Sequence, residues 1–395
     1  MAMPAAIENR TAAAAARAWT SRIVEVQIAR DLGQVEAIWR SLEDRRHFST
    51  PFQGFDFLSA WQREVGARGN LSPFIVVAHD GERRPLLLLP LVLNEHGIRA
   101  AHFMGGKHAT FNMALWDRDF AAAATAADLA ALVSALRRRS GADVLALRQQ
   151  PKRWRDLPNP MAMLPNQASV NDCPLLTMPA GAAPAALISG SFRRRLRSKE
   201  RKLQALPGFR YHVAATDAEI ERLLDWFFLI KPLRMAEQKL PNVFAEQGVE
   251  DFIRRTCLAP VAGGSRVLEI HALECDDEVL AIFAGVADGN RFSMMFNTYS
   301  TSANSRYSPG LVLTRKIIDH YAGCGYRALD LGVGSDGYKR FFCKSDEPLF
   351  DSFIPLSLRG GLAAAAMSAV NRTKYLVKHN QPLLQTALKL RNVLR

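Results

Sequence analysis

The sequence predicts an α/β protein of the α+β kind, with two consecutive domains that each hold a mixed, mainly antiparallel sheet flanked by helices. Three observations lead to this prediction. At 395 residues the chain is longer than one hydrophobic core usually supports. Its 48% of hydrophobic and 23% of charged residues are typical of a globular protein. Helical and strand patterns also run through a similar order twice, which favours two domains of one plan.

We expect these domains at residues 21–180 and 181–357, between a disordered tail at residues 1–20 and a basic helical tail at residues 358–395. The first tail is rich in alanine, is broken by charges, and lacks the compact apolar block of a signal peptide. No run of about eighteen apolar residues occurs, so we expect no membrane-spanning helix. The five dispersed cysteines favour free thiols in a reducing cytoplasm over disulfides or a zinc site.

The elements of the first half follow in order. Residues 34–42 and 55–65 predict helices. Residues 74–78 and 86–92 predict a hairpin, because the intervening Asp80-Gly81 pair supplies the positive φ that a tight turn needs. The remaining elements are a strand at residues 98–104, an alanine-leucine helix at 121–139, a short strand at 144–147 and a proline-rich loop at 151–165.

The second half starts its first long helix at Thr216, which forms a capping-box pattern with Glu219. We expect Pro232 to kink or end this helix. The elements that follow are a helix around residues 252–257, antiparallel strands at 267–273, 279–286 and 292–299, a helix at 309–321, a strand at 327–331, a short helix at 338–342 and a last strand at 352–356.

The helix predicted at residues 309–321 has an unusual start. Ser308 is its N-cap, and Pro309 suits the first helical position because it has no amide hydrogen to leave unpaired. Gly310 has no Cβ to cover the amides of the first turn. Such a start favours an anion, because free N–H donors and the positive end of the helix dipole point outward. An ordinary capped helix is the alternative interpretation.

Further motifs surround this helix start in the sequence. Downstream, a strand ending at Asp330-Leu-Gly332 is followed by Asp336-Gly337-Tyr338-Lys339, and upstream come Lys231 and Arg234, three residues apart, and a basic run at residues 192–203. Together with Ser308-Pro309-Gly310, these motifs resemble the acyltransferases of the GNAT superfamily, in the double-domain branch of CelD-like cellulose-biosynthesis proteins and FemAB aminoacyl transferases. The resemblance covers residues 191–356 and implies two tandem GNAT-like domains.

The resemblance implies that acetyl-CoA or another acyl-CoA is the donor substrate. Main-chain amides of Ser308, Gly310 and Leu311 would bind its pyrophosphate, with Pro309 and Tyr299 completing the cofactor-binding set. The thioester would lie where the strands at residues 292–299 and 327–331 splay apart. The acceptor would contact Lys231, Arg234 and Asn297.

Catalysis would be a direct attack of an amine or hydroxyl on the thioester, which needs a base for the nucleophile and an acid for the leaving thiolate. Tyr338 is the candidate acid, and Asp330 is the candidate base or orienting group. Lys339 is a third candidate, with simple anion binding as its alternative. A packing role for Tyr338 also stays open. We expect no metal, because the histidines show no ligand spacing.

The sequence therefore predicts a cytoplasmic, acyl-CoA-dependent N- or O-acyltransferase. Its acceptor would be a small molecule or glycan precursor in polysaccharide or cell-envelope biosynthesis, and only the resemblance supports that pathway. A FemAB-like transferase that uses aminoacyl-tRNA and a binding protein without catalysis are the alternatives. A GxGxxG pattern at residues 332–337 is a weaker match to a dinucleotide site, because no second strand with an acidic residue follows.

The net charge of +13 comes from two clusters rather than from the whole surface. The first, at residues 192–206, is a helix that is either a solvated surface or binds the 3′-phosphate of CoA, an anionic substrate or tRNA. The second is the tail from Arg359 onward, which has no acidic residue. It is poorly ordered, packs across the domain junction, or contacts an anionic membrane through apolar residues that include Leu384, Ala387, Leu388 and Leu394.

Overall fold

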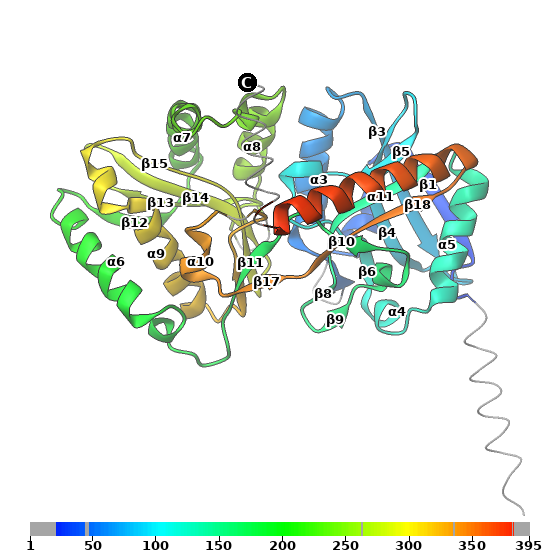
Figure 1. Ribbon diagram of the computed structural model, residues 1–395, viewed down its shortest axis with the longest axis horizontal. Coiled ribbons are helices and arrows are strands. Elements are labelled where there is room, and N and C mark those ends of the chain that lie inside the picture. Colours follow the sequence, from blue (N-terminus) through cyan, green and yellow to red (C-terminus); the bar gives the residue numbers. More distant parts are fainter. Residues whose placement is uncertain (1–20, 44–46, 262–263, 335, 381, 383–395) are drawn as a thin grey trace, which may run out of the picture.

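The computed structural model describes residues 21–43, 47–261, 264–334, 336–380 and 382. Two twisted sheets lie side by side, each with helices packed against it (Figure 1). The predictions for the tail at residues 1–20 and for the apolar residues at 384–394 fall outside the described residues. Among the helices of the described part, none is long and apolar enough to cross a bilayer.

The first sheet is built around a hairpin of β3 (Leu71–His79) and β4 (Pro85–Asn94), which pair antiparallel as predicted. Both strands are almost continuously buried, which explains their runs of valine and leucine. The strand order is β1 (Glu25–Ala29), β3, β4, β5 (Ala100–Phe103), β7 (Val144–Pro151), β18 (Leu349–Pro355) and β10 (Gln167–Ala168), with β6 (Leu115–Asp117) joined to β4 and β2 (His47–Phe48) to β6.

The second sheet follows the same plan. The three strands predicted in succession are β13 (Glu269–Glu274), β14 (Val279–Ala287) and β15 (Arg291–Tyr299), and they pair antiparallel. The full order is β12 (Arg210–Val213), β13, β14, β15, β16 (Ala328–Asp330), β11 (Cys173–Thr177) and β17 (Ser345–Glu347). In each sheet one neighbouring pair is parallel, β5 with β7 and β15 with β16. The prediction of two domains of one plan is confirmed.

The chain exchanges one strand between the two sheets. β11, from the half expected to form the first domain, pairs with β16 and β17 of the second sheet. β18 pairs instead with β7 of the first sheet, from Leu349 opposite Pro151 to Pro355 opposite Val144. The last strand predicted for the second domain, at residues 352–356, therefore belongs to the first sheet. Local sequence specifies a strand here, whereas its partner is set by the long free edge of β7.

Helices cover both faces of the second sheet. α6 (Gly190–Leu203) and α9 (Pro309–Gly323) share one hydrophobic cluster with one face, whereas α7 (Asp217–Glu237) and α8 (Val249–Leu258) pack on the other. The predicted Thr216–Glu219 capping box starts α7, and Pro232 lies inside this helix without ending it. The short α10 (Lys339–Phe342) follows β16.

The first sheet carries α2 (Glu36–Ser41), α3 (Phe55–Trp61), α4 (Arg118–Ala122), α5 (Ala126–Arg139) and α11 (Leu358–His379). The helix predicted at residues 121–139 is two helices, because Thr125 and Asp128 form a second capping box that starts α5. α11 packs against β18 and runs across the front of the first domain in Figure 1. A Cβ at Gly360 would lie 1.7 Å from the Asp143 carbonyl oxygen, so this close docking requires glycine.

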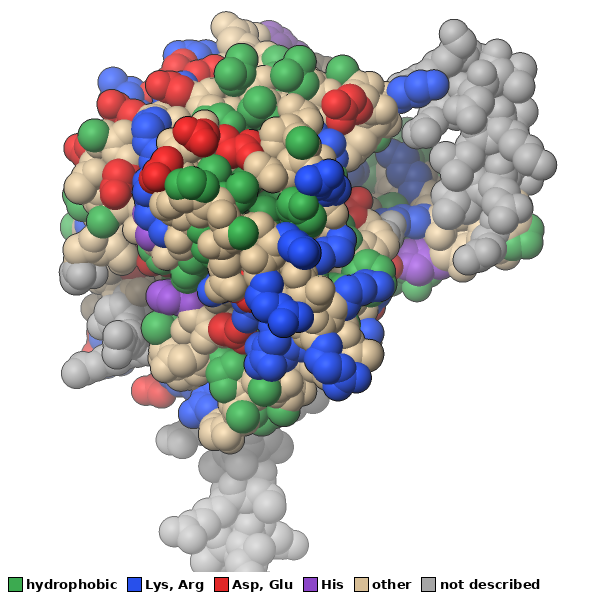
Figure 2. All heavy atoms as spheres, turned by 90° about the vertical axis from the view of Figure 1, so that its left-hand side faces the viewer, with side chains coloured by type: hydrophobic (Ala, Val, Ile, Leu, Met, Phe, Trp, Pro, Cys, Tyr) green, Lys and Arg blue, Asp and Glu red, His purple; other side chains and the backbone are tan. Residues whose placement is uncertain are grey.

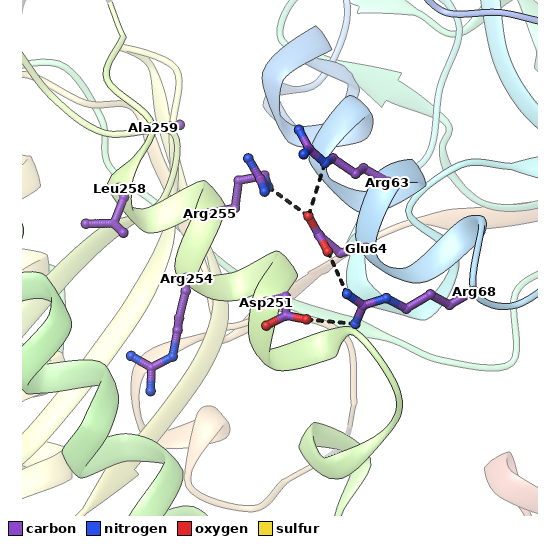
Figure 3. A pocket seen from close by; sticks show the side chains of 8 residues that line it. All are labelled: Arg63, Glu64, Arg68, Asp251, Arg254, Arg255, Leu258 and Ala259. Atoms are coloured by element: carbon purple, nitrogen blue, oxygen red, sulfur yellow. Dashed lines mark hydrogen bonds and ion pairs between the residues drawn. The ribbon is translucent and has the colours of Figure 1, made fainter.

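The two domains meet through a continuous core and a ring of ion pairs. Phe57 of α3 and Phe252 of α8 pack edge to face with ring centroids 5.2 Å apart. Beside them, Arg68 pairs with Asp251 at 2.7 Å and Arg255 pairs with Glu64 at 3.0 Å, around a surface hollow of about 870 Å³ (Figure 3). These arginines already face carboxylates, so we interpret the hollow as a domain contact and not as a ligand site.

Candidate active site

The second sheet opens between β15 and β16. These strands pair only from Arg291 opposite Ala328 to Ser293 opposite Asp330, and β15 then continues to Tyr299 without β16. A register shift between β14 and β15 at Ala284 marks a bulge at the point where the strands part. The splayed strand pair expected from the sequence is therefore present.

A cavity of about 270 Å³ lies in this opening. Tyr299 of β15 forms one wall, and Ser308, Gly310 and Leu311 of the α9 start form another. A Cβ on Gly310 would come within 3.4 Å of the Tyr299 ring, so a longer side chain at this position would enter the cavity. No side chain caps α9, which begins at Pro309 as predicted.

The amides at the start of α9 are not all free. The Ser308 amide donates to the Ser305 carbonyl at 2.9 Å, and the Leu311 amide donates to the Ser308 carbonyl at 3.0 Å. Pro309 has no amide hydrogen. Gly310 thus carries the one amide of the predicted set that has no acceptor within the described part of the chain. Ser308 itself adopts a left-handed conformation with φ of 52°, which turns the chain into the helix.

Two side chains that sequence reasoning missed support this loop. Glu278, directly before β14, accepts hydrogen bonds from the Ser300 hydroxyl at 2.8 Å and the Ser302 hydroxyl at 3.1 Å. Lys199 of α6 donates to the Ser308 hydroxyl at 2.5 Å. Both residues lie far from the loop in the sequence, so no local pattern reveals them. They hold the helix start in place from opposite parts of the domain.

A second cavity, of about 480 Å³, lies between the domains. The first domain contributes Lys107, His108 and Thr110, from a loop to which we assigned no function. The second domain contributes α7, β15 and the segment after β16. Four residues line both cavities: Asn297, Thr298, Tyr299 and Tyr338. The two cavities therefore adjoin at the splayed end of β15.

Tyr338 lies at this junction. Its hydroxyl accepts a hydrogen bond from Asn297 Nδ2 at 3.2 Å. Burial raises the pKa of Tyr338, so the phenol keeps its proton at neutral pH and can donate it. The buried Thr298 hydroxyl, also at the junction, has no protein partner within the described residues. Polar groups of this kind suit a site that a ligand completes.

Asp330 does not reach either cavity. Its side chain is fully buried and pairs with Arg291 at 2.8 Å, and it accepts hydrogen bonds from the Ser293 hydroxyl at 2.5 Å and the Gly332 amide at 3.0 Å. Arg291 also pairs with Glu347 at 2.7 Å. A carboxylate held by these donors cannot contact a substrate, so its geometry is that of a structural ion pair rather than of the predicted base.

Lys339 is also committed to the protein. Its ammonium donates to the carbonyls of Gly332 and Val333, at 3.1 Å each, and its side chain is only 3% exposed. It lines the interdomain cavity and holds the glycine-rich segment after β16 in place. This geometry favours a positioning role over proton transfer. The same contacts explain the GxGxxG pattern, whose glycines form turns beside the cavity.

Lys231 and Arg234, the expected acceptor contacts, line the interdomain cavity from α7. Lys231 donates to the Asn297 carbonyl at 2.9 Å, and burial lowers its pKa to about 8. Arg234 stacks over the Tyr299 ring at 3.9 Å and pairs with Glu237 at 3.0 Å. The two cations therefore border the junction.

His108 faces the same cavity from the first domain. Its Nδ1 accepts a hydrogen bond from Trp61 Nε1 at 3.0 Å. Burial lowers its pKa to about 4, with a contribution from the Lys107 charge. The imidazole is thus neutral at pH 7. Its neighbour Thr110 donates to the Met294 carbonyl at 3.2 Å, which ties this loop to β15 beside the splay.

Residues 190–340 match the family model described as the acetyltransferase (GNAT) domain. Residues 190–340, which include the splayed strands, therefore form a GNAT-type acetyltransferase domain. Comparison with curated proteins gives no significant match.

Solved structures of low sequence identity share this double-domain fold. FemX is 7% identical, with a TM-score of 0.55 over 83% of this chain and 97% of its own. The C-terminal DUF2156 domain of a protein assigned as a lysylphosphatidylglycerol synthetase from Agrobacterium fabrum is 12% identical, with a TM-score of 0.51 over 88% and 97%. At such identity the likeness shows the fold alone.

Proposed function

We propose that the protein transfers an acyl group from acyl-CoA to an amine or hydroxyl acceptor, with the donor in the cavity beside α9 and the acceptor in the cavity between the domains. The observation that supports this best is the meeting of the two cavities at Tyr338, beside the splayed strands. A thioester at that junction would be open to attack from the acceptor side. The Gly310 amide and the positive end of the α9 dipole would bind the pyrophosphate.

The chemistry at the junction follows from direct transfer. The acceptor nitrogen or oxygen attacks the thioester carbonyl carbon, the C–S bond breaks, and the acyl group moves to the acceptor. Tyr338 would give its proton to the leaving thiolate, and the acceptor would release its own proton to solvent. Replacing Tyr338 by Phe should therefore lower turnover about 100-fold with little change in donor affinity. An unchanged rate of CoA release would remove Tyr338 from the mechanism.

The acceptor cavity favours an anionic group on the acceptor. Lys107, Lys231 and Arg234 converge on it from both domains. Glu246 and Glu237 partly balance Lys107 and Arg234, whereas Lys231 forms no ion pair with a carboxylate among the described residues. A glycan precursor that carries phosphate or carboxylate meets this requirement, and its place in an envelope or polysaccharide pathway rests on the sequence resemblance alone.

We also propose peripheral contact of a cytoplasmic protein with an anionic membrane through α11. Leu358 and Leu362 are 96% and 79% exposed on this helix, Arg359 is exposed next to them, and Arg372 and Lys374 are exposed further along it. Because Gly360 docks α11 on the sheet, truncation would disturb the fold, so Leu358→Glu with Leu362→Glu is the better test. Flotation with phosphatidylglycerol liposomes should be lost in this variant. Equal flotation would dismiss the contact.

Aminoacyl-tRNA, as used by FemAB-like transferases, is the alternative donor. Calorimetry of the full-length protein with acetyl-CoA and with a charged tRNA separates the two. We expect acetyl-CoA to bind and Gly310→Glu to abolish binding, because the new carboxylate would occupy the pyrophosphate position. Gly323→Glu, at the opposite end of the same helix with open space around it, is the matched control and should bind normally. Binding of tRNA alone would overturn the donor assignment.

A further inference from the structure

α6 carries two sets of cations that point in different directions. Its apolar residues Phe192, Leu196 and Leu203 are buried against the second domain. Arg195, Lys199 and Lys202 recur at steps of four and three residues and so share one side of the helix. Arg194, Arg197 and Arg201 recur at steps of three and four residues and share another side. Figure 2, which faces this end of the molecule, shows a band of Lys and Arg side chains on it.

Of the two sets, the first contacts a residue that lines the donor cavity, Ser308. Its middle member, Lys199, donates to the Ser308 hydroxyl at 2.5 Å, at the start of α9. The second set borders a separate hollow that it shares with Glu200 and Gln204. We name the first set the loop-side stripe (Arg195, Lys199, Lys202) and the second set the outer stripe (Arg194, Arg197, Arg201).

Buried ion pairs fix the position of α6. Arg193 pairs with Asp319 of α9 at 2.8 Å, and Glu200 pairs with Arg315 of α9 at 2.7 Å. These charges belong to the basic run but point inward and are neutralised. The helix is therefore a rigid support, and the direction of each stripe is set by the protein rather than by solvent.

The loop-side stripe is not neutralised. Within the part of the chain that the structure describes, none of its three members forms an ion pair with a carboxylate. Three cations on adjacent turns repel one another, so an anion bound among them relieves that repulsion. The nearest proposed ligand group is the donor pyrophosphate at Gly310. An acyl-CoA carries a third phosphate, on the ribose, beyond that pyrophosphate.

We propose that the loop-side stripe of α6 binds the 3′-phosphate of the acyl-CoA and so makes the protein selective for CoA over forms that lack this phosphate. The inference rests on the proposed acyl-CoA donor. Lys199 marks where the nucleotide leaves the Ser308 loop, and Lys202 and Arg195 extend the cationic surface along the helix on either side. A phosphomonoester with nearly two negative charges suits a group of several ammonium and guanidinium donors.

The test compares CoA with 3′-dephospho-CoA by calorimetry on the full-length protein. We expect the wild type to bind CoA about tenfold more tightly, as suits a few partly exposed charge contacts. The double variant Lys199→Met with Lys202→Met should bind both ligands with the weaker affinity. The matched control is Arg194→Met with Arg197→Met, which removes two charges at the same spacing from the outer stripe. It should keep the full preference for CoA.

Each other outcome decides against the inference. If both double variants lose the preference for CoA to the same extent, a diffuse positive field and not the loop-side stripe causes that preference. If the wild type binds CoA and 3′-dephospho-CoA with equal affinity, the protein does not recognise the ribose phosphate. A preference for tRNA that both variants weaken would assign α6 to RNA. Failure of the wild type to bind either nucleotide would instead refute the acyl-CoA donor, so the two proposals fail in different ways. Thermal melts of both variants check that α6 stays folded.

Discussion

The two domains share one strand order but start their corresponding helices in opposite ways. In the first domain, Thr125 and Asp128 close the start of α5 as a capping box, and Asp128 also accepts a hydrogen bond from the Arg22 amide at 2.7 Å. In the second domain, Ser308 starts α9 with no side-chain cap. A helix start that the protein satisfies itself is structural, whereas one left without a cap is available to a ligand.

The space beside the parallel strand pair also differs between the two domains: it is filled in the first and open in the second. In the first sheet the chain itself fills the space next to β7, because the Asn112 amide donates to the Gln149 carbonyl at 3.1 Å and Phe111 is fully buried beside it. In the second sheet the corresponding opening between β15 and β16 is a cavity. The first domain is thus closed by its own residues and supports the second. Within the described residues, the second domain keeps two polar groups without a protein partner, the Gly310 amide and the Thr298 hydroxyl.

The strongest way to break this comparison is to give α9 the cap that α5 has. Leu311 stands three residues after Ser308, as Asp128 stands three residues after Thr125. Leu311→Asp should place a carboxylate beside the positive end of α9 and exclude the donor pyrophosphate. We expect acetyl-CoA affinity to fall on the order of 100-fold, because the two anions would compete for one position. Calorimetry measures the affinity.

The matched variant is Leu311→Asn, which has nearly the same size and loses the same apolar contact without adding charge. It should lose far less affinity than Leu311→Asp. Equal losses in the two variants would mean that apolar packing of Leu311, and not the open helix start, determines donor binding.

The reverse change removes the cap from the first domain. Asp128→Ala should lower the free energy of unfolding by about 2 kcal/mol, because α5 loses its cap and the Arg22 amide loses its acceptor. Burial alone would raise the pKa of Asp128, but hydrogen bonds from Arg22 and Thr125 outweigh it and the pKa is lowered. The stabilisation is therefore present at neutral pH and is lost as the pH falls through this lowered pKa. Urea titrations at pH 7 measure the effect.

Donor affinity serves as the control for Asp128→Ala. It should stay at the wild-type value, because α5 and the donor cavity belong to different domains. A variant that loses acetyl-CoA binding in proportion to stability would show that the first domain also takes part in donor binding.

The sequence predicted the features that local patterns determine. The capping box at Thr216 and the helix start at Pro309 depend on residues within one turn, and both are confirmed. The exchange of β11 and β18 has no local signal, because the sequence of a strand does not determine which other strand it pairs with. Asp330 was a candidate base or orienting group because it ends a strand beside the motif. Its partner Arg291, which also pairs with Glu347, lies 39 residues away in the sequence, and only the fold brings it to Asp330.

The smallest expected effect concerns the buried charged residue of each domain, Asp128 in the first and Lys231 in the second. Asp128 in the first domain has its donors, whereas Lys231 in the second faces the acceptor cavity and donates to a main-chain carbonyl, that of Asn297. Burial lowers the pKa of Lys231 from 10.5 to about 8, so the folded protein carries this charge at a cost. Lys231→Met should therefore raise the melting temperature at pH 7, by roughly a few degrees.

The dependence of this gain on pH identifies its cause. Below pH 8 the lysine is charged in both the folded and unfolded states, so the burial cost and the gain from Lys231→Met are complete. Between pH 8 and 10.5 the folded state loses its proton first, the cost shrinks, and the gain should fade toward zero. Lys152→Met, at an exposed lysine of the first domain, should change the melting temperature little at any pH. A Lys231→Met protein that melts lower than wild type at pH 7 would mean that this cation holds the fold together, as Asp128 does, and is not kept for an anionic acceptor.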